Sequence, residues 1–273
     1  AMRSSPRILP TRAVKREDKT KIAIVRSQQT VAELYHFFNI ALHEVAIVQR
    51  LVCCRVCGVI VFSGRMDKQL ALVKGNWPVW AWIAAALATP LVGIISGILI
   101  GFFLDESAAL KEMAEIFRQQ SQSGFTAQLI LMVALTPALC EELLFRGYVQ
   151  SRLTRVFPPV LGVLFSSIVF AAFHMDPVHV IAVVPLGLFL GWLSWQSGSL
   201  FPAIIAHFVN NAVSVLATII APTAGTNTFS LPALEFTLGI LLFGCIGIAA
   251  TSFAAITYRR SPPTSLGATT TPV

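Results

Sequence analysis

Charged residues are scarce in this sequence: they make up 12% of its 273 residues, whereas soluble domains usually carry about 25%. Hydrophobic residues make up 55%, and the mean hydropathy is +0.74. This composition excludes an ordinary soluble domain and indicates a membrane protein. A secretory signal is also missing, because the first thirty residues are basic and polar and lack an apolar core. We therefore expect the first spanning helix to direct its own insertion.

Several sequence motifs with known chemistry are absent. No second cysteine pair or histidine pair follows Cys54 and Cys57 at zinc-finger spacing, so a structural zinc site is not expected. His43 and Glu44 begin an H-E pair, but Ile47 stands where the zinc-protease motif H-E-x-x-H needs its second histidine. The G-x-S-x-G elbow of serine hydrolases is missing too. These absences exclude the familiar zinc and serine protease motifs.

Six apolar runs are long enough to cross a bilayer, which takes about 20 residues. They cover roughly residues 77–103, 127–153, 158–174, 178–195, 200–220 and 237–258. The predicted fold is therefore all-α, a polytopic bundle of about six transmembrane helices. Between the first two runs, residues 105–120 are charged and carry apolar positions at helical spacing, which predicts an amphipathic surface helix.

The sequence divides into three predicted parts. Residues 1–76 form a basic, amphipathic N-terminal extension, residues 77–260 form the transmembrane domain, and residues 261–273 form a Pro/Thr/Ser-rich tail that we expect to be disordered. Within the extension, the apolar stretch 40–62 contains two arginines, and we interpret it as an interfacial helix rather than a seventh span.

The distribution of basic residues predicts the orientation. Thirteen of the twenty lysines and arginines precede Trp77, and Arg259 and Arg260 follow the last span. Cytoplasmic segments of membrane proteins are enriched in these residues. Both termini are therefore predicted to be cytosolic.

A few ionisable or amide groups lie inside the predicted spans, where they are costly and indicate a functional site by default. They are Glu141, Glu142 and Arg146 on the second span, His174 ending the third, His179 starting the fourth, and His207, Asn210 and Asn211 on the fifth. Glu142 and Arg146 are four residues apart and share a helix face, so we expect an ion pair. Glu141 is rotated by about 100 degrees and has no partner on its own helix. Glu141 is therefore free to face a polar cavity and act as a base, with the pair in a supporting role that orients it.

The candidate residues on the other helices fall at overlapping depths. At 1.5 Å per residue, Glu141, His174 and His207 lie about 18, 24 and 11 Å from the cytosolic ends of their helices. One intramembrane cavity could then hold these three groups with Asn211, a set able to activate a water and to stabilise an oxyanion. Glu141, His174 and His207 could equally hold a divalent metal such as zinc. The residues leave both mechanisms open.

Two features near these groups are interpreted as structural. Pro137 has no backbone N–H, so it should free the carbonyl near Val133 and widen the space beside Glu141. Asp176 and His179 are interpreted as a pair at a helix start or in a loop.

Three motifs at these positions resemble the CAAX prenyl endopeptidase and bacteriocin-processing family, also called CPBP or Abi. The first reads Glu141-Glu142-Leu143-Leu144-Phe145-Arg146-Gly147-Tyr148, the second Phe170-Ala-Ala-Phe-His174, and the third runs from Ser197 to Asn211. The resemblance covers roughly residues 127–220. It implies an all-helical bundle whose active set is Glu141, His174, His207 and Asn211, supported by Glu142 and Arg146.

The resemblance also implies hydrolysis of peptide bonds inside the membrane. Its expected substrates are hydrophobic peptides or proteins, including prenylated carboxyl-terminal ones, in contact with the lipid bilayer and not with nucleic acid. Family members have been described both as metal-dependent and as glutamate-dependent, so a bound metal such as zinc stays an open expectation.

Two other functions fit the same helices. A protein of this fold that no longer cleaves could serve as a membrane scaffold or a bacteriocin-immunity protein, but such a role would not need all four polar residues. A transporter or proton relay also buries carboxylates and histidines. No inverted repeat of the motifs is evident in the two halves of the chain, however. An intramembrane endopeptidase is the function predicted.

Overall fold

The computed structural model describes residues 70–221 and 231–258, which fall in one compact unit. Within these ranges every regular element is a helix and no strand occurs. The all-α fold predicted from the sequence is confirmed. The expected interfacial helix at 40–62 and the expected tail at 261–273 lie outside the described residues.

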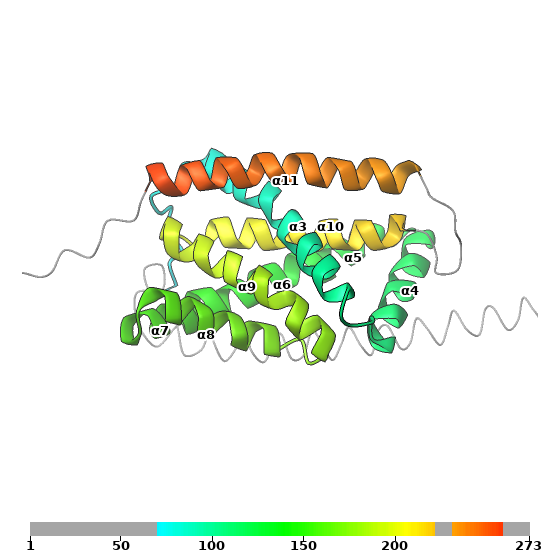
Figure 1. Cartoon of the computed structure of the whole chain (residues 1–273), viewed down its shortest axis with the longest axis horizontal. Helices are drawn as coiled ribbons and strands as arrows, with labels where there is room; N and C mark the ends of the chain where they lie inside the picture. Colours follow the sequence, from blue (N-terminus) through cyan, green and yellow to red (C-terminus); the bar gives the residue numbers. More distant parts are fainter. Residues whose placement is uncertain (1–69, 222–230, 259–273) are drawn as a thin grey trace, which may run out of the picture. The chain divides into compact units, whose positions relative to one another are not determined.

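The helices follow one another with short connections, and Figure 1 labels most of them. In chain order they are α3 (Val79–Gly101), α4 (Ala108–Gln122), α5 (Thr126–Leu129), η1 (Ile130–Leu135), α6 (Thr136–Glu142), η2 (Leu143–Gln150), α7 (Ser151–Val156), α8 (Pro159–Ala172), α9 (Pro177–Ser197), α10 (Phe201–Ile220) and α11 (Leu231–Thr257). The segments α5 to α7 form one continuous helix, Thr126–Val156. Within it, η1 and η2 are π-helical.

Five of the described helices are long and apolar enough to cross a membrane, as expected of an integral membrane protein. The third predicted span is the exception, since α8 has 14 residues. At 1.5 Å per residue α8 is about 21 Å long, which is shorter than a hydrocarbon core of about 30 Å. The helix ends early because the chain turns at Met175, where φ is 57 degrees, and starts α9 at Pro177.

The surface helix predicted at 105–120 is present as α4. Ser107 caps its start, with Oγ accepting the N–H of Leu110 at 3.2 Å, and the helix has no buried residue. Near its other end, Arg118 Nε donates to the carbonyl of Thr218 at 3.1 Å, close to the end of α10. The bond from Arg118 attaches the exposed helix to the bundle.

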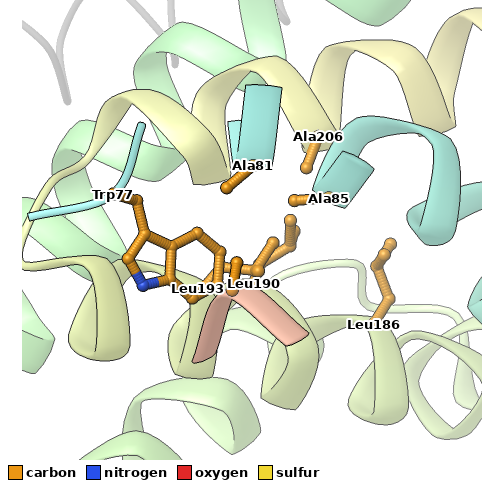
Figure 2. Close-up of a cluster of buried hydrophobic side chains, with 8 residues drawn as sticks. Trp77, Ala81, Ala85, Leu186, Leu190, Leu193 and Ala206 are labelled. Carbon is orange, nitrogen blue, oxygen red and sulfur yellow. The ribbon is translucent and has the colours of Figure 1, made fainter. Parts of the chain in front are cut away.

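The largest buried cluster combines small residues of α3, α10 and α11 with leucines of α9. Figure 2 shows alanines of α3 lying beside leucines of α9, with Trp77 at one end. Its members are Trp77, Ala81, Ala85, Leu186, Leu190, Leu193, Ala206 and Ala254. Small side chains allow helix backbones to approach closely, which is how helices in lipid gain van der Waals contact. In this way α3 packs against α9, α10 and α11.

Helix α11 touches the backbone of α3 at a glycine. A Cβ on Gly247 would lie 2.6 Å from the backbone nitrogen of Ala88 and 2.7 Å from the carbonyl oxygen of Ala84. No side chain fits there, so Gly247 fixes how closely α11 approaches α3.

The residues before α3 are bonded to the corner between α9 and α10. The N–H of Asn76 donates to the carbonyl of Ser197, and the N–H of Leu200 donates to the carbonyl of Ala71, both at 2.9 Å. Gly75 has a φ of +68 degrees, and a Cβ there would lie 2.3 Å from the Ser197 oxygen. Glycine is required at this position, and residues 71–76 hold the start of α10 in place.

Candidate active site

Glu142 and Arg146 form the ion pair expected from their spacing. Arg146 Nη1 donates to Glu142 Oε1 at 2.7 Å, and both side chains are fully buried. Arg146 also donates from Nη2 to the carbonyl of Gly187 on α9, at 3.1 Å. The pair thus joins the second span to α9.

Glu142 also contacts His207, a partner on another helix that the sequence did not indicate. His207 Nδ1 lies 2.8 Å from Glu142 Oε1. A carboxylate paired with arginine only accepts, so Nδ1 carries the hydrogen and Nε2 is left with a lone pair when the ring is neutral. This contact could not be predicted, because the rotation of a helix relative to α10 cannot be read from that helix alone. The role of the Glu142–Arg146 pair in orienting Glu141 stays a prediction. The result is a buried chain of contacts from Arg146 through Glu142 to His207.

Glu141 faces the other nitrogen of the same imidazole. Its Oε2 lies 3.9 Å from His207 Nε2, and its side chain is 25% exposed, whereas that of Glu142 is not exposed at all. The two atoms are too far apart for a direct hydrogen bond. Their separation allows one water, about 2.8 Å from each atom, to bridge them. We name the four residues Glu141, Glu142, Arg146 and His207 the charged cluster.

Phe170 explains why the second motif begins with an aromatic residue. Its fully buried ring lies under the Arg146 guanidinium, with Cζ 4.0 Å from the ring centroid. It also makes edge-on contacts with the rings of His174 and His207, at centroid distances of 5.2 and 5.8 Å. Phe170 therefore contacts Arg146 of the first motif, His207 of the third motif and His174 of its own motif.

Replacing Phe170 by alanine is expected to lower both stability and activity. Buried Phe-to-Ala changes cost about 3 to 5 kcal/mol, and here the arginine also loses its ring contact. The control is Phe165→Ala on the same helix, because Phe165 is 41% exposed. Thermal unfolding of the purified variants in detergent measures the difference. Equal melting temperatures for the two variants would contradict this role for Phe170.

His174 lies close to the cluster, at the end of α8. Its Nδ1 is 3.2 Å from the carbonyl of Phe170. Since a carbonyl only accepts, Nδ1 carries the hydrogen and Nε2 is the basic nitrogen. The sequence left His179 outside the site, but its ring lies 4.7 Å from that of His174. Of the two predicted settings for His179 and Asp176, the structure has the helix start, where Asp176 Oδ1 accepts the N–H of His179 at 2.9 Å.

Asn211 bonds to the second span at the backbone carbonyl that the missing N–H of Pro137 was predicted to free. Asn211 Nδ2 donates to the carbonyl of Val133, four residues before the proline, at 3.4 Å. Its Oδ1 accepts from Asn210 Nδ2 at 3.3 Å. Asn210 is buried against α3, where a Cβ on Gly93 would lie 2.8 Å from its Oδ1. Asn210 therefore positions Asn211, a role the sequence did not indicate.

A second side chain on η2 repeats the contact that Arg146 makes with α9. Gln150 Nε2 donates to the carbonyl of Gly191 at 2.9 Å, one turn after the bond from Arg146 to Gly187. A Cβ on Gly191 would lie 2.7 Å from Gln150 Oε1. The spacing of Glu142, Arg146 and Gln150 at intervals of four was the signal that could have identified this residue.

The predicted metal ligands are Glu141, His174 and His207. Among residues 70–221 and 231–258, no three or more His, Cys, Asp or Glu side chains are grouped so that they could hold a metal ion. His207 uses Nδ1 for Glu142, and His174 uses Nδ1 for Phe170. These Nδ1 bonds leave the Nε2 atoms of both histidines available, as in histidines that bind a metal. A metal held by Glu141, His174 and His207 therefore stays a prediction, and the mechanism below uses the side chains alone.

Comparison with known proteins identifies the part of the chain that holds the site. Residues 123–213 match the family model of the Rce1-like type II CAAX prenyl endopeptidases, a third of the 273 residues. No curated protein and no solved structure matches the chain. The matched segment contains the charged cluster, His174 and Asn211. The site segment of this chain is therefore similar to the Rce1-like type II CAAX prenyl endopeptidases, in agreement with the resemblance carried by the three motifs.

Proposed function

We propose that this chain is an intramembrane endopeptidase that uses a water activated by Glu141 to hydrolyse peptide bonds of hydrophobic, membrane-associated substrates, CAAX-type peptides among them. The observation that carries the proposal is the partly exposed Glu141 carboxylate 3.9 Å from the buried His207 imidazole. The match of residues 123–213 supports the peptidase class. The location of the site among membrane-spanning helices supports hydrophobic substrates.

The charged cluster is electrically neutral when it holds one additional proton. Arg146 carries one positive charge, and Glu141 and Glu142 carry one negative charge each. One proton on Glu141 Oε2 or on His207 Nε2 therefore brings the sum to zero. Neutrality is favoured because a net charge buried in a low-dielectric environment is costly. With the proton on His207, Glu141 is an ionised base and His207 is a hydrogen-bond donor on the same side.

In this state the cluster can begin hydrolysis. Glu141 takes a proton from the water as the water oxygen attacks the substrate carbonyl carbon. The oxyanion that forms accepts the N–H of His207 Nε2 and the second N–H of Asn211 Nδ2, whose first is used by Val133. When the carbon–nitrogen bond breaks, the proton held by Glu141 passes to the leaving amine. We assign this transfer to His174, whose Nε2 is free to carry it.

The test is cleavage by purified protein in lipid nanodiscs. The substrates are a peptide ending in a prenylated CAAX sequence, the same peptide without the lipid, an apolar transmembrane peptide and a soluble peptide. Mass spectrometry of the products gives the scissile bond. Cleavage of at least one hydrophobic peptide, lost in Glu141→Gln, is the expected result. If none of the peptides is cleaved, the proposed peptidase function is contradicted, and a scaffold or immunity protein of the same fold becomes the favoured function.

The same assay examines the metal question. Activity is measured with and without a chelator, and metal content is measured by elemental analysis. Loss of activity with chelator, together with bound metal that disappears in His174→Ala and His207→Ala, would support a metal-dependent mechanism. Equal activity in both conditions would support water activation by the side chains alone.

Both termini of the chain are expected to be cytosolic, on the basis of the basic-residue count. Termini on one side require an even number of crossings, so this prediction takes the short helix α8 as a crossing in addition to the five long helices. Reporter fusions at position 76, in the segment 104–126 and after Arg260 measure this. The segment 104–126 contains α4 and is expected on the opposite side from the other two sites. A cytosolic signal from that segment would reverse the orientation.

A further inference from the structure

His174 receives little support from its own helix. It lies two residues after the end of α8, and its backbone N–H donates to the carbonyl of Ala171 in a tight turn at 3.0 Å. The next residue, Met175, is in the left-handed region with a φ of 57 degrees. An imidazole on such a turn must be fixed by side-chain contacts if it is to hold one orientation.

Aromatic rings contact the His174 imidazole from both directions along the chain. Phe170, four residues earlier, makes an edge-on contact at a centroid distance of 5.2 Å and an interplanar angle of 78 degrees. His179, five residues later, makes a second edge-on contact at 4.7 Å and 63 degrees. Edge-on pairs at these distances are favourable geometries for aromatic rings. The carbonyl of Phe170 fixes the position of Nδ1. Together with the rings of Phe170 and His179, it determines the direction in which Nε2 points.

His179 is well placed to act as a support, because its own position is fixed. It lies in the first turn of α9, and its backbone N–H is bonded to the capping carboxylate of Asp176 at 2.9 Å. The bond from the N–H of His179, and after it the side chain of Ser107, the capping residue of α4, hold the pKa of Asp176 below its usual value. The cap therefore stays ionised, which also suits the positive end of a helix dipole.

We propose that His179 is a positioning residue for His174 and acts through contact between the two rings. The proposal rests on the proposed function, in which His174 Nε2 carries a proton to the leaving amine. His179 lies inside the family-matched segment but in none of the three motifs. Its role is to keep the His174 ring from turning away from the substrate.

Two variants distinguish the contribution of the His179 ring from that of its nitrogen atoms. His179→Ala removes the ring and is expected to lower kcat about 10- to 100-fold, the scale of a small misplacement of a catalytic group. His179→Phe keeps an aromatic ring and is expected to stay within about threefold of wild type, with an unchanged pH profile, since edge-on packing is retained. Ile181→Ala, at an exposed position two residues later, is the control and should be fully active.

Two results would overturn this inference. One is a wild-type kcat for His179→Ala. The other is a stable His179→Phe that is as inactive as His179→Ala, because the nitrogens of His179 would then be needed. If His179→Ala does not accumulate, His179→Leu takes its place, since leucine fills the space without a planar ring.

A double-mutant cycle tests whether His179 acts through His174. In the background of His174→Ala, adding His179→Ala should cause no further loss of kcat, because residues that act as a unit are not additive. An additional tenfold loss in the double variant would contradict the inference. The cycle also separates the two proposals. A fully active His174→Ala removes His174 from the proposed mechanism, whereas an inactive His174→Ala beside a fully active His179→Ala removes only the role of His179.

Discussion

Glu141→Gln is expected to lower peptidase activity at least about a hundredfold, the lower end of the effect of a positioned proton acceptor. Glutamine keeps the size of the side chain and most of its hydrogen bonding, but it cannot take a proton from water. Abundance and melting temperature should stay close to wild type, because Glu141 is partly exposed and His207 keeps its bond to Glu142. Cleavage of a reporter peptide in nanodiscs gives the rate.

Two glutamate controls sharpen this result. Glu112→Gln changes an exposed carboxylate on α4 and should have wild-type activity. Glu142→Gln changes the adjacent carboxylate, and it should reduce stability as well as activity, because Arg146 and His207 both lose a charged partner. A Glu141→Gln enzyme that cleaves at the wild-type rate would refute the general-base mechanism and equally a role of Glu141 as metal ligand.

Arg146→Ala is expected to destabilise the protein by about 3 to 5 kcal/mol, the range for removing one partner of a buried ion pair. Both side chains of the pair are fully buried, so Glu142 would keep its charge with only His207 as a partner. The bond to Gly187 and the contact with the Phe170 ring are lost as well. Thermal unfolding in detergent and accumulation in the membrane measure the change.

The matched control is Arg152→Ala, which removes an exposed arginine from the same continuous helix. Its guanidinium lies 3.6 Å from the Tyr148 ring centroid, an exposed contact worth about 0.5 to 1 kcal/mol. Arg146→Lys should fall between the two alanine variants, because lysine keeps the charge but cannot make two bonds in a fixed fork. If Arg146→Ala accumulates and melts like wild type and is nevertheless inactive, Arg146 takes part in the chemistry rather than in folding.

The sequence predicted correctly those features that depend on the geometry of a single helix. The interval of four between Glu142 and Arg146 predicts their ion pair, because such residues share a face of a helix. The missing N–H of Pro137 predicts an available carbonyl at Val133, and Asn211 bonds to it. Continuous apolar runs likewise predict the five long helices.

Relations between helices could not be predicted in the same way. Glu142 and His207 are separated by 65 positions, and their contact depends on how two helices are rotated against each other. Hydropathy also gave no sign that the third span would end after 14 residues, because the turn at Met175 depends on backbone conformation and not on polarity. The same turn brings His179 beside His174, which is why a residue outside the motifs was missed.

The charged cluster is assembled from two separate helices, and this affects how its charges enter the membrane. A chain is made from its amino end, so the helix Thr126–Val156 reaches the bilayer before α10 has been synthesised. At that moment Glu142 already has Arg146 four residues away, and those two charges can insert together. Glu141 has to wait for His207, and in lipid a carboxylate without a partner is less costly when it is protonated. The additional proton that makes the charged cluster neutral in the proposed mechanism can thus be acquired during biogenesis, before any substrate is met.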